Sequence, residues 1–377
     1  MNQKQKDLLA IFLRFLRFGF LAWGGPVAQI GMIKDELVDK EKWIAPEKFN
    51  RTLAVYQALP GPEAHELCVY FGMIRAGRWG GFLAGLGFML PGFILMILCA
   101  AIYKIYGTSF LLPIFAGVAP AISALMVRAA HRITETILHD QYLIYIGIAA
   151  IVLTLFRMHF LWIFAISAMF YVFWVKEKII LAYSSILLLV LIMFLEHPEK
   201  SSFSLAHVGL FIEGLKAGLL SFGGAYTAVP FLKGTMVGHY PSVTDNSFLD
   251  ALAFANVLPT PLVMFATFLG FLAGSFGGAL LITIGIFLPA FSFTLFGHKY
   301  LEKLIENKSC HAALDAISAA VTGMLILAAI QLFIHAIGSF LQLVLFALAL
   351  GGLYQWKWRW NAPVIVIMCG LVGYLAL

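Results

Sequence analysis

Apolar segments follow one another along most of the chain, and only short polar gaps separate them. A helix needs ~20 apolar residues to cross a bilayer, and most of these segments reach or approach that length. The pattern therefore predicts an all-α polytopic membrane protein with about thirteen transmembrane segments. They lie at roughly 8–33, 48–75, 79–106, 109–131, 141–157, 159–175, 179–195, 205–232, 247–273, 276–298, 310–336, 338–354 and 362–377. Prolines interrupt 48–75 and 247–273, so the pattern leaves open whether these two span or re-enter.

Glycine and proline positions in the first half of the chain recur in the second half. The offset is 199 residues, the difference between positions 24 and 223. The matched positions are Gly24 with Gly223, Gly25 with Gly224, Pro60 with Pro259 and, one residue out of step, Pro91 with Pro289. Many transporters consist of two related halves that contain broken helices. We therefore expect a first repeat domain with linking helices at 1–195 and a second repeat domain at 205–377.

Composition supports membrane insertion. Hydrophobic residues make up 62% and charged residues 12% of the chain, whereas a soluble domain is about one-quarter charged. The net charge of +6 is explained by Lys and Arg in cytoplasmic loops, so no nucleic-acid partner is expected. The cysteines lack metal-site or redox spacing, and there is no phosphate-binding Walker loop. No metal, cofactor or direct use of ATP is predicted.

The distribution of basic residues predicts orientation. If the N-terminus is cytoplasmic and all segments cross, most Lys and Arg fall on the inner side of a cell (inner) membrane. The loop 34–51 does not fit this rule, because it would lie on the outer side although it contains five basic residues. An odd number of crossings before the second copy makes the two copies enter from opposite faces. The fold expected is therefore two inverted structural repeats.

The matched glycines and prolines are predicted to break helices within the membrane. Glycine lets the backbone leave helical geometry, and proline suits the first turn of a new helix. Each new helix N-terminus carries about +0.5 charge and free N–H donors, which together favour an anion. The alternative is a kink or a close helix contact without a ligand. The candidate binding positions are Gly24, Gly25, Pro60, Gly61, Gly223, Gly224, Pro259 and Thr260.

Basic and amide side chains are also matched between the copies. Arg17 aligns with Lys216, and each precedes its glycine pair by seven residues, or about two helical turns. We expect both to neutralise the anion, with snorkelling to the membrane surface as the alternative. Gln57 aligns with Asn256, three residues before Pro60 and Pro259, so these amides are also assigned to substrate binding.

Acidic and histidine side chains follow the second break. Glu63 and His65 are candidates to hold a coupling proton. Glu63 in a first helical turn would alternatively complement the helix dipole. The second half has no equivalent pair, so a proton site here would be asymmetric.

Several motifs follow one another in the first half. They are Phe18-Gly19 through Gly24-Gly25-Pro26, Leu59-Pro60-Gly61-Pro62 with Glu63-Ala64-His65-Glu66-Leu67, Gly80-Gly81, and Leu90-Pro91-Gly92. In this order they resemble the chromate ion transporter family, and because the resemblance covers both halves of the chain, its long, two-domain form. The resemblance implies chromate efflux, with sulfate as a related oxyanion, driven by the membrane potential or an ion gradient. The second half departs from the pattern at Ala225 and Thr260, so the halves need not contribute equally.

The residues agree with an oxyanion substrate, because helix N-termini, amides and cations suit a tetrahedral dianion. They do not separate chromate from sulfate, export from uptake, or a secondary active transporter from an anion channel. A membrane-embedded enzyme would need a nucleophile–base or metal constellation, and the sequence contains none, so no enzyme is predicted. Besides the oxyanion, the lipid bilayer is the expected partner. The coupling ion and a homodimer are left open.

Overall fold

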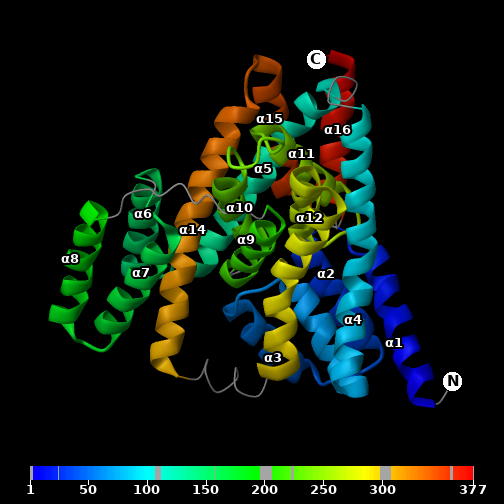
Figure 1. The fold of residues 1–377 in the computed structure, drawn as a ribbon, viewed down its shortest axis with the longest axis horizontal. Coiled ribbons are helices and arrows are strands. Elements are labelled where there is room, and N and C mark those ends of the chain that lie inside the picture. Colours follow the sequence, from blue (N-terminus) through cyan, green and yellow to red (C-terminus); the bar gives the residue numbers. More distant parts are fainter. Residues whose placement is uncertain are drawn as a thin grey trace.

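The computed structural model describes residues 3–23, 25–106, 112–156, 158–195, 206–221, 225–297, 307–356 and 360–376. Over these ranges the chain is helical, apart from one isolated bridge between Val237 and Tyr240, and the all-α fold class is confirmed (Figure 1). The first half contains α1 (Gln3–Phe20), α2 (Gly25–Ile33), η1 (Lys34–Lys40), α3 (Pro46–Ala58), α4 (Glu63–Tyr106), α5 (Leu112–Ile137), α6 (Gln141–Leu155), α7 (Phe160–Val175) and α8 (Ile179–Leu195). The second half contains α9 (Ala206–Leu220), η2 (Ala225–Thr227), α10 (Ala228–Met236), α11 (Asp245–Val257), η3 (Leu262–Met264), α12 (Phe265–Ser292), η4 (Phe293–Gly297), α14 (Lys308–Ala336), α15 (Phe340–Gln355) and α16 (Asn361–Ala376).

Four helical stretches in the described ranges are long and apolar enough to cross a membrane. They are Glu63–Ile105, Pro113–Ile137, Leu262–Gly297 and Lys308–Ala336. Other apolar helices, such as α6, α7, α15 and α16, are shorter, at 10–17 residues. An integral membrane protein is thus supported, whereas the expected thirteen crossings are not confirmed.

Helix α4 is a hairpin of two helical arms. A Cβ placed on Gly80 would lie 2.5 Å from the carbonyl oxygen of Gly72, although eight residues span ~12 Å in a straight helix. The chain reverses at Ala76 and Gly77, whose backbone is non-helical. Helix α12 reverses in the same way at Gly274 and Ser275. The first arm of α4, 63–75, is therefore only ~20 Å long, too short to span a bilayer.

The segments predicted at 8–33 and 48–75 also fold back. Arg14 in α1 lies 3.4 Å from Glu36, which follows α2, so α2 returns along α1. The rings of Phe49 and Phe71 are 6.4 Å apart, on opposite sides of the break after α3. Both segments therefore fold back at a helix break in mid-segment, and the single crossing expected for 8–33 is not confirmed.

The loop 34–51 lies at the same end of the molecule as the turn of α4. The guanidinium of Arg75 is 5.4 Å from the Trp43 ring, and Arg14 forms an ion pair with Glu41. Sequence reasoning had put this loop opposite residues 75–78. That assignment is corrected, because α2 brings the chain back to the side where α1 begins. The five basic residues of the loop therefore lie with Arg75 and Arg78.

Close backbone contacts are duplicated between the halves. A Cβ on Gly19 would lie 2.6 Å from the Phe88 carbonyl oxygen, and one on Gly218 would overlap the Ile286 carbonyl. Likewise, Gly87 approaches the backbone of Phe12 as Gly285 approaches that of Phe211. These pairs obey the sequence offset, so α1 packs on the second arm of α4 as α9 packs on that of α12.

The second arms of α4 and α12 lie side by side and antiparallel. Arg78, just after the turn of α4, lies over the Phe296 ring near the far end of the other arm, at 5.1 Å. At the opposite end, Lys104 Nζ is 3.4 Å from Ser275 Oγ at the turn of α12. Between them, the rings of Phe82 and Phe291 are 5.5 Å apart.

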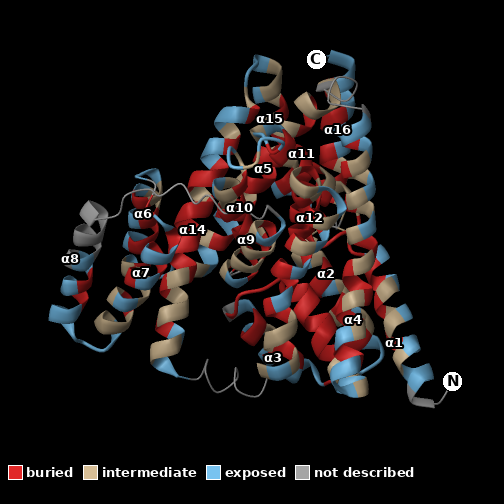
Figure 2. Cartoon of the chain, viewed as in Figure 1, coloured by how far each residue is buried: buried red, intermediate tan, exposed pale blue. Residues whose placement is uncertain are grey.

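The remaining helices of each half pack against helices of the other half. Helix α5 packs on α15 and α16, whereas α14 packs on α6 and α7, and Figure 1 shows α14 beside α6 and α7. One hydrophobic cluster therefore includes residues from Met89 to Cys369, and buried residues fill the centre of the molecule (Figure 2). The halves 1–195 and 205–377, predicted as domains, share this core.

Replacing Gly80 with alanine tests the reversal in α4. The new Cβ would meet the Gly72 carbonyl oxygen at 2.5 Å, and overpacking of this kind typically costs ~1–3 kcal/mol. We expect Gly80→Ala to lower the thermal unfolding midpoint of the purified protein in detergent.

Gly351→Ala in α15 is the matched control, because a Cβ there meets nothing within 4 Å. Alanine favours a helix over glycine by about 0.5–1 kcal/mol, so this variant should be at least as stable as the native protein. Equal midpoints for the two variants would contradict the chain reversal.

Candidate functional site

Four helix breaks define the centre of the molecule. The first break separates α1 from α2, the second is 59–62, the third separates α9 from η2, and the fourth is 258–261. The backbone φ of Gly25, after the first break, is +76°, and that of Gly61 in the second is +151°, both in a region that favours glycine. Gly24, Gly223 and Gly224 were predicted as binding positions and lie outside the described residues. Pro60, Gly61, Pro259 and Thr260 lie in their breaks and are buried.

Hydrogen bonds join breaks from different halves. Gln29 Nε2 in α2 donates to the carbonyl of Ala22 at 2.9 Å and to that of Thr260 at 3.0 Å. The first break is thereby joined to the fourth. The Gly61 N–H donates to the Ser221 carbonyl at 3.1 Å, which joins the second break to the third.

A further contact joins the first and third breaks. A Cβ placed on Gly25 would lie 3.8 Å from the hydroxyl of Tyr226, which is in η2 directly after the third break. In addition, η2 packs against η3, the short helix that follows the fourth break. All four breaks therefore meet where the two halves pack together.

The convergence brings several helix N-termini to one region. Helices α2, α4, η2 and η3 each begin directly after a break, at Gly25, Glu63, Ala225 and Leu262. For the α-helices, the first N–H groups have no partner within the helix and carry partial positive charge. This arrangement favours an anion.

Glu63 holds one of the predicted amides. The Gln57 side chain hydrogen-bonds the Glu63 carboxylate, and Arg132 of α5 acts on it electrostatically. The Glu63 side chain is buried. The matched amide behaves differently, because Asn256 Nδ2 donates to the Leu252 carbonyl of its own helix at 2.8 Å. The two amides predicted as a pair thus have different roles.

Two arginines near the breaks were not predicted as site residues. Arg128 and Arg132 of α5 both act electrostatically on the Tyr226 hydroxyl. Both lie at the end of the apolar segment predicted at 109–131. Their four-residue spacing puts them on one helix face, and that spacing, beside an apolar segment, was the signal available.

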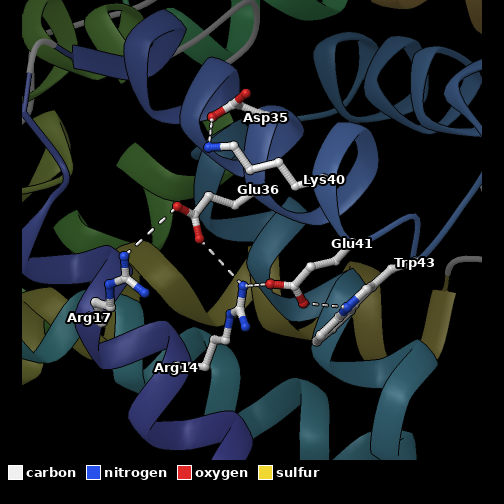
Figure 3. Close-up of polar contacts among 7 residues, drawn as sticks. All are labelled: Arg14, Arg17, Asp35, Glu36, Lys40, Glu41 and Trp43. Carbon is white, nitrogen blue, oxygen red and sulfur yellow. Dashed lines mark hydrogen bonds and ion pairs between the residues drawn. The ribbon is translucent and has the colours of Figure 1, made fainter.

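The predicted cations Arg17 and Lys216 form ion pairs instead of facing the breaks. Arg17 is 63% exposed and lies 3.9 Å from Glu36, as Figure 3 shows. Lys216 Nζ is 3.3 Å from Glu213 in the same helix. Arg17 and Lys216 match in the sequence repeat, but in this conformation each has an acidic partner, Glu36 and Glu213 respectively.

The predicted proton-site residue His65 is enclosed by aromatic rings. Its ring centroid lies 4.7 Å from that of Phe287 and 4.6 Å from that of Phe291. A Cβ on Gly85 would lie 2.8 Å from His65 Nε2, so the ring is also packed on the second arm of α4. His65 is fully buried and therefore helps to hold the hairpin against α12.

Comparison with known proteins identifies the chain's family. A family model described as chromate transporter matches residues 9–172 and 208–374, one match in each half. A chromate transport protein of Pseudomonas aeruginosa is 43% identical over 382 residues, with 97% of this chain and 91% of that protein covered. A chromate transport protein of Cupriavidus metallidurans is 28% identical, with 98% of this chain and 93% of that protein covered.

A shorter relative matches only part of the chain. It is an uncharacterized transporter of Bacillus subtilis, 30% identical over 158 residues, with 40% of this chain and 86% of that protein covered. No solved structure matches the chain. Because the family model covers both halves and relatives align over nearly the full length, the chain belongs to the chromate transporter family.

Proposed function

We propose that this membrane protein exports chromate from the cell by secondary active transport, with the four helix breaks as the oxyanion site. The observation that carries the proposal is the pair of hydrogen-bonded links between the halves, Gln29 to Thr260 and Gly61 to Ser221. They bring several helix N-termini together at the contact between the two halves. Membership of the chromate transporter family favours chromate as the oxyanion, and sulfate has the same tetrahedral shape and charge.

The proposed architecture is an inverted repeat. The contacts of α1 with α4 recur between α9 and α12, and the second arms of α4 and α12 are antiparallel. If these arms lie along the membrane normal, the repeats face opposite sides, which is the usual basis of alternating access. The basic residues of loop 34–51 and of the turn of α4 then lie on one side with the start of α1. By the positive-inside rule that side is the cytoplasm, at the inner membrane of the cell.

The cytoplasmic side has an entrance in this proposal. A cavity of about 770 Å³ lies between the start of α1, the loop 34–51 and the turn of α4, and its walls include Arg14 and Arg75. Substrate would pass from this cavity towards the first and second breaks. In this proposal, the hydrogen bonds of Gln29 to Thr260 and of Gly61 to Ser221 close the path between the halves. Both hydrogen bonds would break when the outer side opens, and other groups would replace these partners.

The proposed binding groups differ between the halves. The free N–H groups after the first and second breaks, the Tyr226 hydroxyl and the charges of Arg128 and Arg132 would contact or attract the oxyanion. Arg17 and Lys216 remain part of the proposal as cations of the pathway, released from their acidic partners during transport. Uptake of sulfate, or a passive anion channel, is the alternative function.

The energy source separates a transporter from a channel. In liposomes held at zero membrane potential, an imposed gradient of a second ion should drive net chromate movement against the chromate concentration gradient, which a secondary active carrier permits and a channel does not. Movement that follows only the electrochemical gradient of chromate, and that continues unchanged when every other ion gradient is abolished, would indicate a channel.

The inverted repeat predicts opposite labelling of equivalent turns. In a cysteine-free background, Arg78→Cys at the turn of α4 and Ser275→Cys at the turn of α12 are both exposed positions. A membrane-impermeant thiol reagent added to intact cells should modify Cys at 275, and should modify Cys at 78 only after the membrane is permeabilised. Labelling of both from the same side would refute the inversion.

Removing the charge of each arginine should show how much it contributes to chromate binding. A charge-assisted hydrogen bond contributes about 1.5–3 kcal/mol, so losing one weakens binding by about tenfold or more. We expect Arg132→Gln to raise the apparent chromate KM by this amount, and Arg132→Lys to restore part of it.

Arg17→Gln is the comparison, because Arg17 is largely exposed and paired with Glu36. It should change the chromate KM less than Arg132→Gln does. The chromate KM is measured from chromate uptake by inverted membrane vesicles. A larger increase in KM for Arg17→Gln than for Arg132→Gln would indicate that Arg17 binds the oxyanion, as the sequence alone predicted.

A further inference from the structure

Glu66 lies in the first arm of α4, one turn after Glu63. Its side chain is fully buried, and neither carboxyl oxygen has a hydrogen-bond partner in the part of the chain that the structure describes. Buried carboxylates in proteins are normally paired or bound by several donors. Glu66 therefore requires an explanation that packing alone does not supply.

The Glu66 carboxyl lies against the second break. A Cβ placed on Gly61 would be 2.7 Å from Oε1 and 3.2 Å from Oε2. Both oxygens thus face the backbone of Gly61, whose N–H donates to Ser221 in the other half. The described residues contain no cluster of three or more His, Cys, Asp or Glu side chains that could hold a metal ion.

The groups around Glu66 do not stabilise a negative charge on it. The titratable and charged side chains nearby are Glu63 and His65 on the same helix, Tyr226 in η2, and Arg128 and Arg132 in α5. Of these, only the Glu63 carboxylate acts on Glu66, and it repels a second negative charge. Gln57 and Arg132 instead act on Glu63. An ionised carboxylate that is buried without partners is strongly disfavoured, so Glu66 holds a proton in this conformation.

We propose that Glu66 is the proton-binding site of the transport cycle, and that each oxyanion moves together with one proton bound there. This inference rests on the proposed function. When the contact between Gly61 and Ser221 opens and water reaches the carboxyl group, the O–H bond breaks, the proton passes to water and a carboxylate remains. A carboxylate beside Gly61 repels an oxyanion at the same break, so the proton and the anion favour each other's binding.

The proton changes the charge that the cycle moves. A dianion with one proton carries a net charge of −1 across the membrane. A membrane potential that is negative inside still drives that charge outward. Proton binding at Glu66 is therefore compatible with export, and it halves the charge moved per oxyanion.

Glu66 differs from the residues that the sequence suggested. Glu63 has Gln57 and Arg132 as partners, whereas His65 lies between the rings of Phe287 and Phe291. The Glu66 carboxyl has no hydrogen-bond partner among the described residues. The proton-carrier role is therefore assigned to Glu66.

The experiment measures chromate flux and charge movement together in liposomes that contain the full-length protein, at mildly alkaline pH where chromate is a dianion. For the native protein we expect one net charge to move per chromate. We also expect the apparent affinity for chromate to fall as the pH rises, by up to tenfold per pH unit, which is the limit for one linked proton. Glu66→Gln and Glu66→Met are neutral at every pH. Both should move two charges per chromate, with an affinity independent of pH.

Glu63→Gln is the matched control. It should keep one net charge per chromate and a pH-dependent affinity, with that dependence shifted to lower pH because the repulsion of Glu66 by the Glu63 carboxylate is removed. The inference is overturned if Glu66→Gln or Glu66→Met keeps the native charge ratio, if the Glu63 variant alone loses it, or if Na⁺ replaces the proton in the native protein. Native liposomes without chromate flux would instead refute the proposed function, and the inference would fall with it.

Discussion

Backbone groups freed by a helix break inside a membrane must find partners within the protein, because lipid offers none. The rest of this structure depends on that constraint. At the first and fourth breaks, the Gln29 amide supplies donors to two carbonyl groups, Ala22 and Thr260. At the second and third breaks, Gly61 and Ser221 satisfy each other. Each half therefore completes the hydrogen bonding of the other, and neither set of breaks is satisfied alone.

Glycine contacts make that arrangement sterically accessible. Short helices such as α2 and the first arms of α4 and α12 must pack against neighbours at backbone distance to reach the centre. Gly19 and Gly87 allow this in the first half, and Gly218 and Gly285 allow it in the second. Because helices in lipid gain little from the hydrophobic effect, such small-residue contacts supply much of their association. The exchange of α5 and α14 between the halves then encloses the breaks in one core.

Much of the fold follows from the sequence, because repeats and helix breaks are local patterns. Gly25, Pro60 and Thr260 were recognised from glycine and proline chemistry and from the offset between the halves. The turns at Ala76 and Ser275 fall in gaps between predicted segments. Hydropathy did not show that the chain folds back at the breaks within 8–33 and 48–75. Counting both as crossings put loop 34–51 opposite residues 75–78.

The candidate site was predictable where it consists of backbone, and less so where it consists of side chains. Arg17 and Lys216 align in sequence, yet their orientation depends on Glu36 and Glu213, and pairing of that kind is not visible in the repeat. Gln29 and Tyr226 have no distinguishing sequence signal. Their importance comes from contacts between residues some two hundred positions apart, such as Gln29 with Thr260.

The central claim is that an oxyanion binds where the four breaks meet. A structure of the protein with chromate bound would test it most directly, because chromium scatters anomalously and marks its own position. The account predicts a chromium peak within hydrogen-bond reach of the backbone at Gly25 and Gly61 and near the Tyr226 hydroxyl. A fully occupied peak elsewhere, with the Gln29–Thr260 and Gly61–Ser221 contacts intact and no density between the breaks, would contradict it.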